Sequence, residues 1–218
     1  MVTKHTTSTQ TVTTVIERLR KKHPDAKYEL NWETPFQLLI ATILAAQCTD
    51  ERVNRVTATL FKTYPTPQAF VDAPVAELEK ALEPTGFFRQ KTKTVQACCR
   101  TLIDKFKGDV PDDMARLTQL PGVARKTANV VLNTAFNQAS GIIVDTHVKR
   151  VAPRMGLTLL EDPNDIEQDL MKIIPKTDWT FFGPAMVLHG RYTCVAKKPK
   201  CAECVFNDIC PKKGVLAS

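Results

Sequence analysis

Apolar residues recur at helical spacing along almost the whole chain, and no sustained alternation of apolar and polar residues is present. The pattern is clearest after Thr34, which is a typical N-cap; Pro35 suits the first helical position, and Gln37 completes a capping box. The apolar stripe of this helix consists of Phe36, Leu39, Ile40, Ile43 and Leu44. The sequence therefore predicts an all-α fold.

Further helix starts are marked by acidic caps and prolines. Asp50, Asp145 and Asp162 are predicted N-caps, and Pro67 and Pro74 each stand where a short helix would begin. Inward-facing residues of the other predicted helices are Val12, Val15, Ile16 and Leu19, then Val53, Val56 and Leu60, then Val95, Cys98, Leu102 and Phe106, and finally Ile166, Leu170 and Ile173.

The charge balance favours a polyanionic partner. The 218 residues include 30 Lys and Arg against 23 Asp and Glu, a formal net charge of +7. Nucleic acid is the first candidate for such a partner and an anionic membrane the second. No apolar run approaches the roughly 18 residues of a spanning helix, and the Thr-rich start lacks an apolar signal core. We expect a cytoplasmic protein.

Four of the seven cysteines lie in the last 25 residues. Cys194, Cys201, Cys204 and Cys210 have the spacing C-x6-C-x2-C-x5-C, which predicts a closed, structural four-thiolate site. Zinc and a 4Fe–4S cluster both accept four thiolates, so the residues alone leave the metal open. The other three cysteines, Cys48, Cys98 and Cys99, lie in apolar helical stretches and are predicted to be small buried hydrophobic residues.

A basic segment surrounds the first of these ligands. Arg191 precedes it, and Lys197, Lys198 and Lys200 follow it before the second ligand. A metal that fixed this loop would create a surface able to bind phosphate groups.

A tight turn at Leu120-Pro-Gly-Val-Ala124 separates two predicted helices, the second running from about Arg125 to Phe136. A helix N-terminus at such a turn offers backbone N–H groups to a phosphate, although Pro121-Gly122 also fits an ordinary interhelical turn.

Lys126 lies in the first turn of that second helix, beside Arg125. The helix dipole and the neighbouring charge both favour the neutral, nucleophilic amine, but a phosphate contact is the alternative for a lysine at this place.

Asp145 follows the apolar residues 142–144. Two interpretations are open. Asp145 is a helix cap and nothing more, or it is a cap that is also catalytic because its outer oxygen faces a cleft.

Together these segments closely resemble the endonuclease III family from about Tyr28 to Cys210. The resemblance rests on LPGVARKTANVVL (120–132), VDTH (144–147), HGRYTC (189–194), FQLLIATILAAQCTD (36–50) and the cysteine spacing. It implies two helical domains flanking a DNA cleft. One is a six-helix barrel with a helix-hairpin-helix at residues 28–138, and the other is a discontinuous domain of residues 1–27 and 139–218 that binds a 4Fe–4S cluster rather than zinc.

The resemblance also implies roles for single residues. Lys126 would be the nucleophile and Asp145 its catalytic carboxylate, while Gln47 and Phe87 would fill the gap left by an extruded base. The turn of the family is usually Gly-x-Gly, whereas this chain has Gly122 and then Ala124. Alanine would be strained there if the backbone needs a positive φ, and unstrained in the helical region.

The implied activity is that of a monomeric bifunctional DNA glycosylase and abasic-site lyase. It would remove oxidised pyrimidines from duplex DNA through a lysine Schiff base and β-elimination. One alternative is a monofunctional mismatch glycosylase, which Lys126 argues against because those relatives lack lysine at this position. The other is a non-catalytic paralogue that binds DNA or senses redox state.

Overall fold

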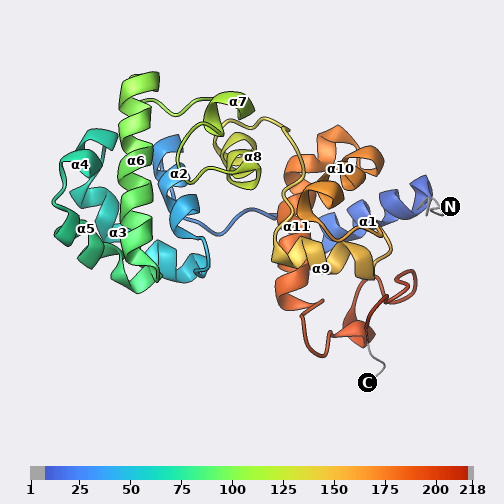
Figure 1. Cartoon of the computed structure of the whole chain (residues 1–218). Helices are drawn as coiled ribbons and strands as arrows, with labels where there is room; N and C mark the ends of the chain where they lie inside the picture. Colours follow the sequence, from blue (N-terminus) through green and yellow to red (C-terminus); the bar gives the residue numbers. More distant parts are fainter. Residues whose placement is uncertain (1–7, 216–218) are drawn as a thin grey trace. The chain divides into compact units, whose positions relative to one another are not determined.

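The computed structural model describes residues 8–215, and throughout that range the regular structure is helical, without a strand. This confirms the predicted all-α fold. The chain forms two compact units, one of Glu29–Ser140 and one that combines the described parts of Met1–Tyr28 and Gly141–Ser218 (Figure 1). Residues 1–7 of the Thr-rich start lie outside the described residues, whereas its part from Thr9 to Thr14 belongs to the first helix. Among those described, no helix is both long and apolar enough to span a membrane.

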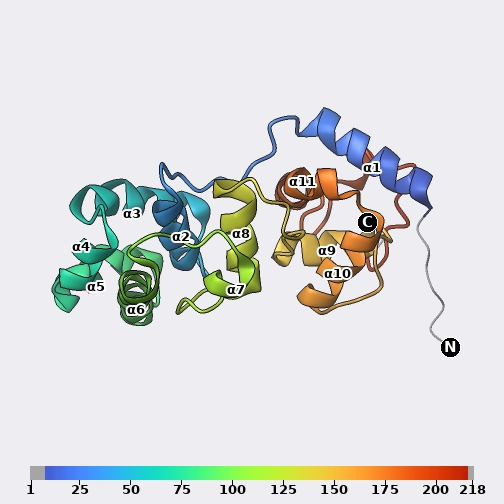
Figure 2. The same cartoon turned by 90° about the horizontal axis from the view of Figure 1, so that it is seen from above.

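The continuous unit, Glu29–Ser140, is built around the long helix α6. Its elements are α2 (Pro35–Leu44), α3 (Asp50–Thr63), α4 (Pro67–Asp72), α5 (Val75–Leu82), η1 (Glu83–Thr85), α6 (Phe88–Phe106), α7 (Met114–Leu117) and α8 (Arg125–Ala135). Helix α6 packs against α4 and α5, and α2 packs against α8 (Figures 1 and 2). The side chains of Leu39, Ile40, Leu44 and Leu102 are fully buried in its core.

The start of α2 confirms the predicted capping box, with one difference. The hydroxyl of Thr34 accepts a hydrogen bond from the Gln37 N–H at 3.2 Å. The side-chain oxygen of Gln37, Oε1, in turn accepts from the N–H of Glu33, one residue before the cap, at 2.8 Å. The predicted apolar stripe of α2 is buried.

The prediction that Asp50 caps α3 is wrong. Thr49 is the N-cap, because its backbone is extended and its side chain accepts from the Arg52 N–H. Asp50 is instead the first helical residue, where its negative charge favours the positive end of the helix dipole.

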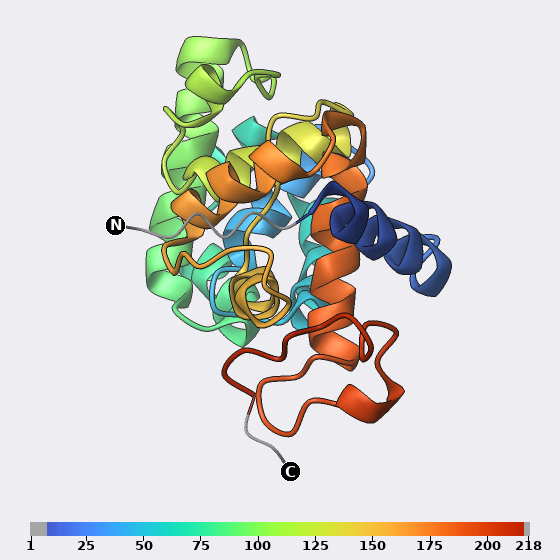
Figure 3. The same ribbon diagram turned by 90° about the vertical axis from the view of Figure 1, so that its right-hand side faces the viewer.

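The discontinuous unit joins the two ends of the chain. Its elements are α1 (Thr9–Lys22), α9 (Thr146–Arg154), α10 (Pro163–Ile173), η2 (Lys176–Asp178), α11 (Trp179–Tyr192) and η3 (Cys201–Glu203). Helix α11 lies against both α1 and α9 (Figures 2 and 3). The predicted apolar stripe of α1 is buried against this unit's core.

Helix α11 packs closely on its neighbours through two glycines. A Cβ on Gly190 would lie 2.8 Å from Cβ of His147 on α9, and one on Gly183 would lie 3.1 Å from the Tyr28 hydroxyl. Glycine at these positions therefore lets α11 approach both α9 and the chain segment after α1.

Candidate functional sites

The hairpin turn in the continuous unit requires glycine at position 122. Gly122 has a φ of +80°, and a Cβ there would lie 2.3 Å from Cγ2 of Thr94 on α6. The turn is closed by a hydrogen bond from the Val123 N–H to the Leu120 carbonyl at 3.0 Å. Leu120 and Val123 are buried, so the turn is fixed on the core rather than held only by its own backbone.

Ala124, which departs from the family's turn pattern, is not strained. It is the N-cap of α8 with φ −83° and ψ 171°, an extended conformation that any residue adopts. Its conformation is extended rather than helical, but it does not require a positive φ. No side chain caps α8. The backbone N–H groups at its N-terminus can therefore bind an anion such as a phosphate.

Lys126 is the second residue of α8, and its side chain is exposed. The opposite face of the helix is anchored in the core by Ala128 and Val131. Two buried amides, Asn129 and Asn133, share the hydroxyl of Ser140, which donates to their side-chain oxygens at 2.8 and 3.1 Å. The helix that carries the candidate nucleophile is therefore held by both apolar and polar contacts.

Gln47 and Phe87 are both exposed, and both have left-handed backbone conformations with φ of 53° and 48°. Phe87 is 67% exposed, whereas the adjacent Phe88 packs against the core. The structure therefore distinguishes two neighbouring aromatic residues that the sequence could not separate. A large apolar side chain held out in solvent in a strained conformation points to a role outside the core.

Asp145 lies in the discontinuous unit and caps α9, as predicted. Its Oδ1 accepts hydrogen bonds from the N–H groups of His147 at 2.8 Å and Val148 at 2.9 Å. Oδ2 accepts neither bond. The residue is half-buried and follows the buried segment 142–144. One carboxylate oxygen is thus committed to the helix, and the other can serve a second role.

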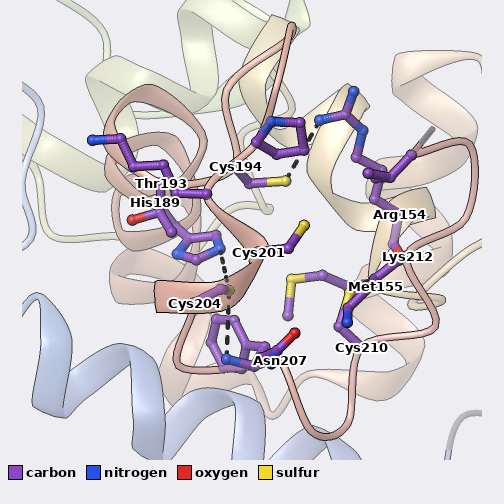
Figure 4. Close-up of a pocket in the computed structure, with 14 residues that line it drawn as sticks. Arg154, Met155, His189, Thr193, Cys194, Cys201, Cys204, Asn207, Cys210 and Lys212 are labelled. Atoms are coloured by element: carbon purple, nitrogen blue, oxygen red, sulfur yellow. Dashed lines mark hydrogen bonds between the residues drawn. The ribbon is translucent and has the colours of Figure 1, made fainter. Parts of the chain in front are cut away.

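The four C-terminal cysteines line one pocket, together with the apolar side chains of Met155 and Phe206 (Figure 4). Burial raises the pKa of Cys204 and Cys210, and the neighbouring thiols raise it further. Four thiolates would repel each other in this pocket unless a cationic group lay between them. The pocket therefore fits a bound metal centre.

The donor set fits a 4Fe–4S cluster. In such a cluster each iron takes one thiolate, and four cysteines line this one pocket. By contrast, Cys98 and Cys99 are fully buried, and burial raises the pKa of Cys98 to about 12, as expected for inert core residues.

Polar groups also contact the sulfurs. The guanidinium of Arg154 approaches Cys194 Sγ at 3.7 Å, and the Phe206 N–H donates to Cys204 Sγ at 3.5 Å. His189 Nε2 lies 3.7 Å from Cys204 Sγ, and burial lowers the pKa of this histidine to about 4. Such contacts tune and orient metal ligands.

The cysteine loop is tied to two helices, α9 and α1. From α9, Arg150 donates to the Cys194 carbonyl at 3.2 Å and Arg154 to that of Val195 at 2.8 Å. From α1, Arg18 binds the Val205 carbonyl at 2.6 Å and both carboxylate oxygens of Asp208. These arginines carry no distinctive signal in the sequence, because their helical spacing is also that of an ordinary solvated face.

The lysines of the predicted basic segment are exposed. Lys197, Lys198 and Lys200 project from the loop, and Arg191 is half-buried. Because Arg154 binds carbonyls of the same loop, the lysines extend from a fixed backbone.

Two family models match the chain. The model described as HhH-GPD superfamily base excision DNA repair protein covers residues 40–176. The model described as iron-sulfur binding domain of endonuclease III covers residues 194–210, which begin and end at the first and last cysteines of the site.

Curated relatives and solved structures agree with these models. Endonuclease III of Synechocystis sp. is 50% identical over 202 residues, which cover 93% of this chain and 92% of that protein. Two solved structures are 43% identical with a TM-score of 0.90, covering 95% of this chain and 97% of theirs. One is described as a non-covalent endonuclease III–DNA complex and the other as a trapped endonuclease III–DNA covalent intermediate.

The fold and the hairpin define a helix-hairpin-helix base excision DNA repair protein. Within that class, the chain belongs to the endonuclease III family and carries its iron–sulfur binding domain. The protein is accordingly a DNA repair enzyme of the glycosylase and abasic-site lyase type, and its cofactor is a 4Fe–4S cluster.

Proposed function

We propose that this enzyme removes oxidised pyrimidines from duplex DNA and cleaves the strand at the resulting abasic site, with Lys126 as the nucleophile. The observation that carries the proposal is the exposed amine of Lys126 in the first turn of α8, directly after a turn that Gly122 fixes on the core. An amine in the family's hairpin distinguishes the lyase from the monofunctional relatives.

The proposed reaction uses one residue for two steps. The neutral amine of Lys126 attacks the sugar C1′, the bond from C1′ to the base breaks, and the base leaves with the bonding electrons and then takes up a proton. Loss of the amine proton and opening of the sugar ring give a Schiff base between Nζ and C1′. Removal of a C2′ proton then drives β-elimination, which expels the 3′ phosphate and cuts the strand.

Asp145 would stabilise the positive charge that develops on the sugar and help to move protons. Its Oδ1 is held by two N–H groups of α9, which orients the carboxylate and leaves Oδ2 for the reaction. Fixed groups of this kind lower a barrier because they need no reorganisation during the reaction.

Backbone phosphates would be bound by the hairpin and the basic loop. The hairpin contributes Gly122, Ala124, Arg125 and the uncapped start of α8. The loop contributes Arg191, Lys197, Lys198 and Lys200. Gln47 and Phe87, exposed in the continuous unit, would enter the duplex and fill the gap left by the extruded base.

We assign the four cluster ligands to Cys194, Cys201, Cys204 and Cys210. The cluster supplies binding energy that folds the C-terminal loop. No step of the proposed reaction needs electron transfer. In this proposal the two units are the two functional domains, and the enzyme acts as a monomer in the cytoplasm, associated with the nucleoid.

The proposal is tested with a panel of duplexes that carry thymine glycol, hydroxylated cytosine, an abasic site or a mismatch. We expect base release and strand cleavage on both oxidised pyrimidines, and strand cleavage alone at the abasic site. Base release from the mismatch without strand cleavage would instead identify a monofunctional glycosylase. Binding to all four duplexes without any cleavage would identify a non-catalytic DNA-binding protein.

We expect the affinity for undamaged duplex to fall steeply with salt. If about four or five phosphates are neutralised, the log–log slope is on the order of −4. Lys197→Gln and Lys200→Gln should each flatten the slope by about one, because each removes one phosphate contact. Filter binding or fluorescence anisotropy over a salt series measures the slope of log affinity against log salt concentration.

The control is Lys80→Gln, which removes an equal charge from an exposed position on α5 and should leave the slope unchanged. If the two loop variants behaved like this control, the basic loop would not bind the DNA backbone.

A further inference from the structure

The amine of Lys91 is buried in the continuous unit, outside the residues that the proposed reaction uses. Lys91 is 5% exposed and lies in the first turn of α6. Among the described residues, only it and Glu167 are buried members of the Asp, Glu, Lys and Arg set. Burial lowers the pKa of its ammonium, so the position costs free energy. A buried lysine that has no acidic partner within residues 8–215 therefore calls for an explanation.

Lys91 donates two hydrogen bonds to the same short loop. Its Nζ binds the carbonyl of Thr85 at 2.8 Å, and its backbone N–H binds that of Phe87 at 3.0 Å. These carbonyls lie on either side of Gly86. The Thr85 side chain is itself buried and donates to the Leu82 carbonyl at 2.7 Å. Lys91 thus fixes the segment that leads from η1 into α6.

The loop needs such support because two consecutive residues have a positive φ. Gly86 has φ 70°, which glycine tolerates, but Phe87 has φ 48° and ψ 30°. This conformation costs a residue with a side chain about 1–2 kcal/mol. It persists only where the surrounding contacts determine it. Without the ammonium, the loop could relax and the exposed phenyl ring would lose its fixed direction.

We propose that Lys91 is a positioning residue for base extrusion: its buried ammonium holds the Thr85 carbonyl so that Phe87 is presented to the duplex in a fixed conformation. The inference rests on the proposed function, because it takes Phe87 to enter the duplex. Fixing the ring before binding lowers the entropy cost of inserting it.

The test compares Lys91→Met, Phe87→Ala and the double variant. Methionine keeps most of the volume of the lysine stem but cannot donate to Thr85. We expect Lys91→Met to slow single-turnover excision of thymine glycol by about tenfold, with a smaller effect on cleavage at a preformed abasic site, where no base is extruded. A 2-aminopurine opposite the lesion should show less fluorescence increase on binding. The double variant should be no slower than Phe87→Ala alone.

The matched control is Lys93→Met, two residues further along α6 and exposed, which should behave as wild type. Wild-type excision by Lys91→Met, or a double variant whose defect is the product of the two single defects, would overturn the inference. If Lys91→Met does not fold, Lys91→Gln, with a shorter and uncharged donor, replaces it in the same comparison.

Hydrogen exchange separates this inference from the proposed function. Loss of the ammonium should speed amide exchange at Gly86 and Lys91, whose N–H groups bond within the loop, whether or not any lesion is excised. Unchanged exchange at both amides would show that Lys91 does not hold the loop. Inactivity of the wild-type protein on every lesion would instead refute the proposed function.

Discussion

Lys126→Gln should abolish strand cleavage and, when borohydride is present, the covalent adduct with lesion-bearing DNA. Borohydride reduces the imine between a lysine amine and the opened sugar to a stable secondary amine, so the wild-type enzyme should be trapped during turnover. Glutamine has no nucleophilic amine. A denaturing gel with labelled DNA shows both the adduct and the cut strand.

The variant should still fold and bind DNA. Lys126 is exposed, and removing a positive charge from the first turn of α8 does not weaken the helix. We expect its affinity for duplex to fall by no more than about tenfold, the loss of one phosphate contact. Lys62→Gln, an exposed lysine on α3, is the control and should trap like wild type. Cleavage and trapping by Lys126→Gln would mean that another amine is the nucleophile.

Asp145→Asn should retain duplex binding but lose base excision by about a hundredfold or more. The amide cannot stabilise cationic character at the sugar. It can, however, still accept the hydrogen bonds from His147 and Val148, because asparagine caps helices as well as aspartate does. Single-turnover excision of thymine glycol measures the loss.

Asp145→Ala separates the two roles of this residue. It removes the cap as well as the charge and should lower the free energy of unfolding by about 1 kcal/mol, whereas Asp145→Asn should leave it nearly unchanged. Full excision activity in Asp145→Asn would reduce Asp145 to a helix cap. Thermal denaturation of all three proteins, compared with their excision rates, decides between these outcomes.

Local signals in the sequence predicted much of the fold. Thr34, Pro35 and Gln37 predicted the start of α2, and Asp145 the start of α9, because caps act through neighbouring backbone groups. The same reasoning failed at Asp50, where Thr49 provides an equally good cap one residue earlier. Two adjacent capping residues cannot be ranked without the backbone angles.

Helix α11 was missed because it is buried on almost every side. The residues from Phe182 to Val187 are all buried, including Gly183 and Pro184, so no polar face marks its period. Glycine and proline in succession also suggest a break. Here the glycine allows close packing, a property that depends on the neighbouring helix and cannot be read from the segment alone.

The sequence predicted the chemistry of a site only where a few residues of one type have a distinctive spacing. The spacing of the cysteines predicted a four-thiolate centre, and the structure places all four around one pocket. Lys91 gave no signal, because a lysine among polar residues at a helix start is expected to be solvated. Its burial depends on the fold of the preceding loop, which the sequence pattern does not describe.

The discontinuous unit has a consequence for synthesis on the ribosome. Helix α1 emerges before the rest of its unit, but its apolar face packs in a core that also contains residues of α11 and the cysteine loop. At about 5–20 residues per second, those partners appear on the order of 10 s later. The segment Glu29–Ser140 can fold during that interval, whereas α1 must wait with Val12, Val15 and Leu19 uncovered. The nascent chain therefore exposes the apolar face of α1 to chaperones until α11 and the cysteine loop have been made.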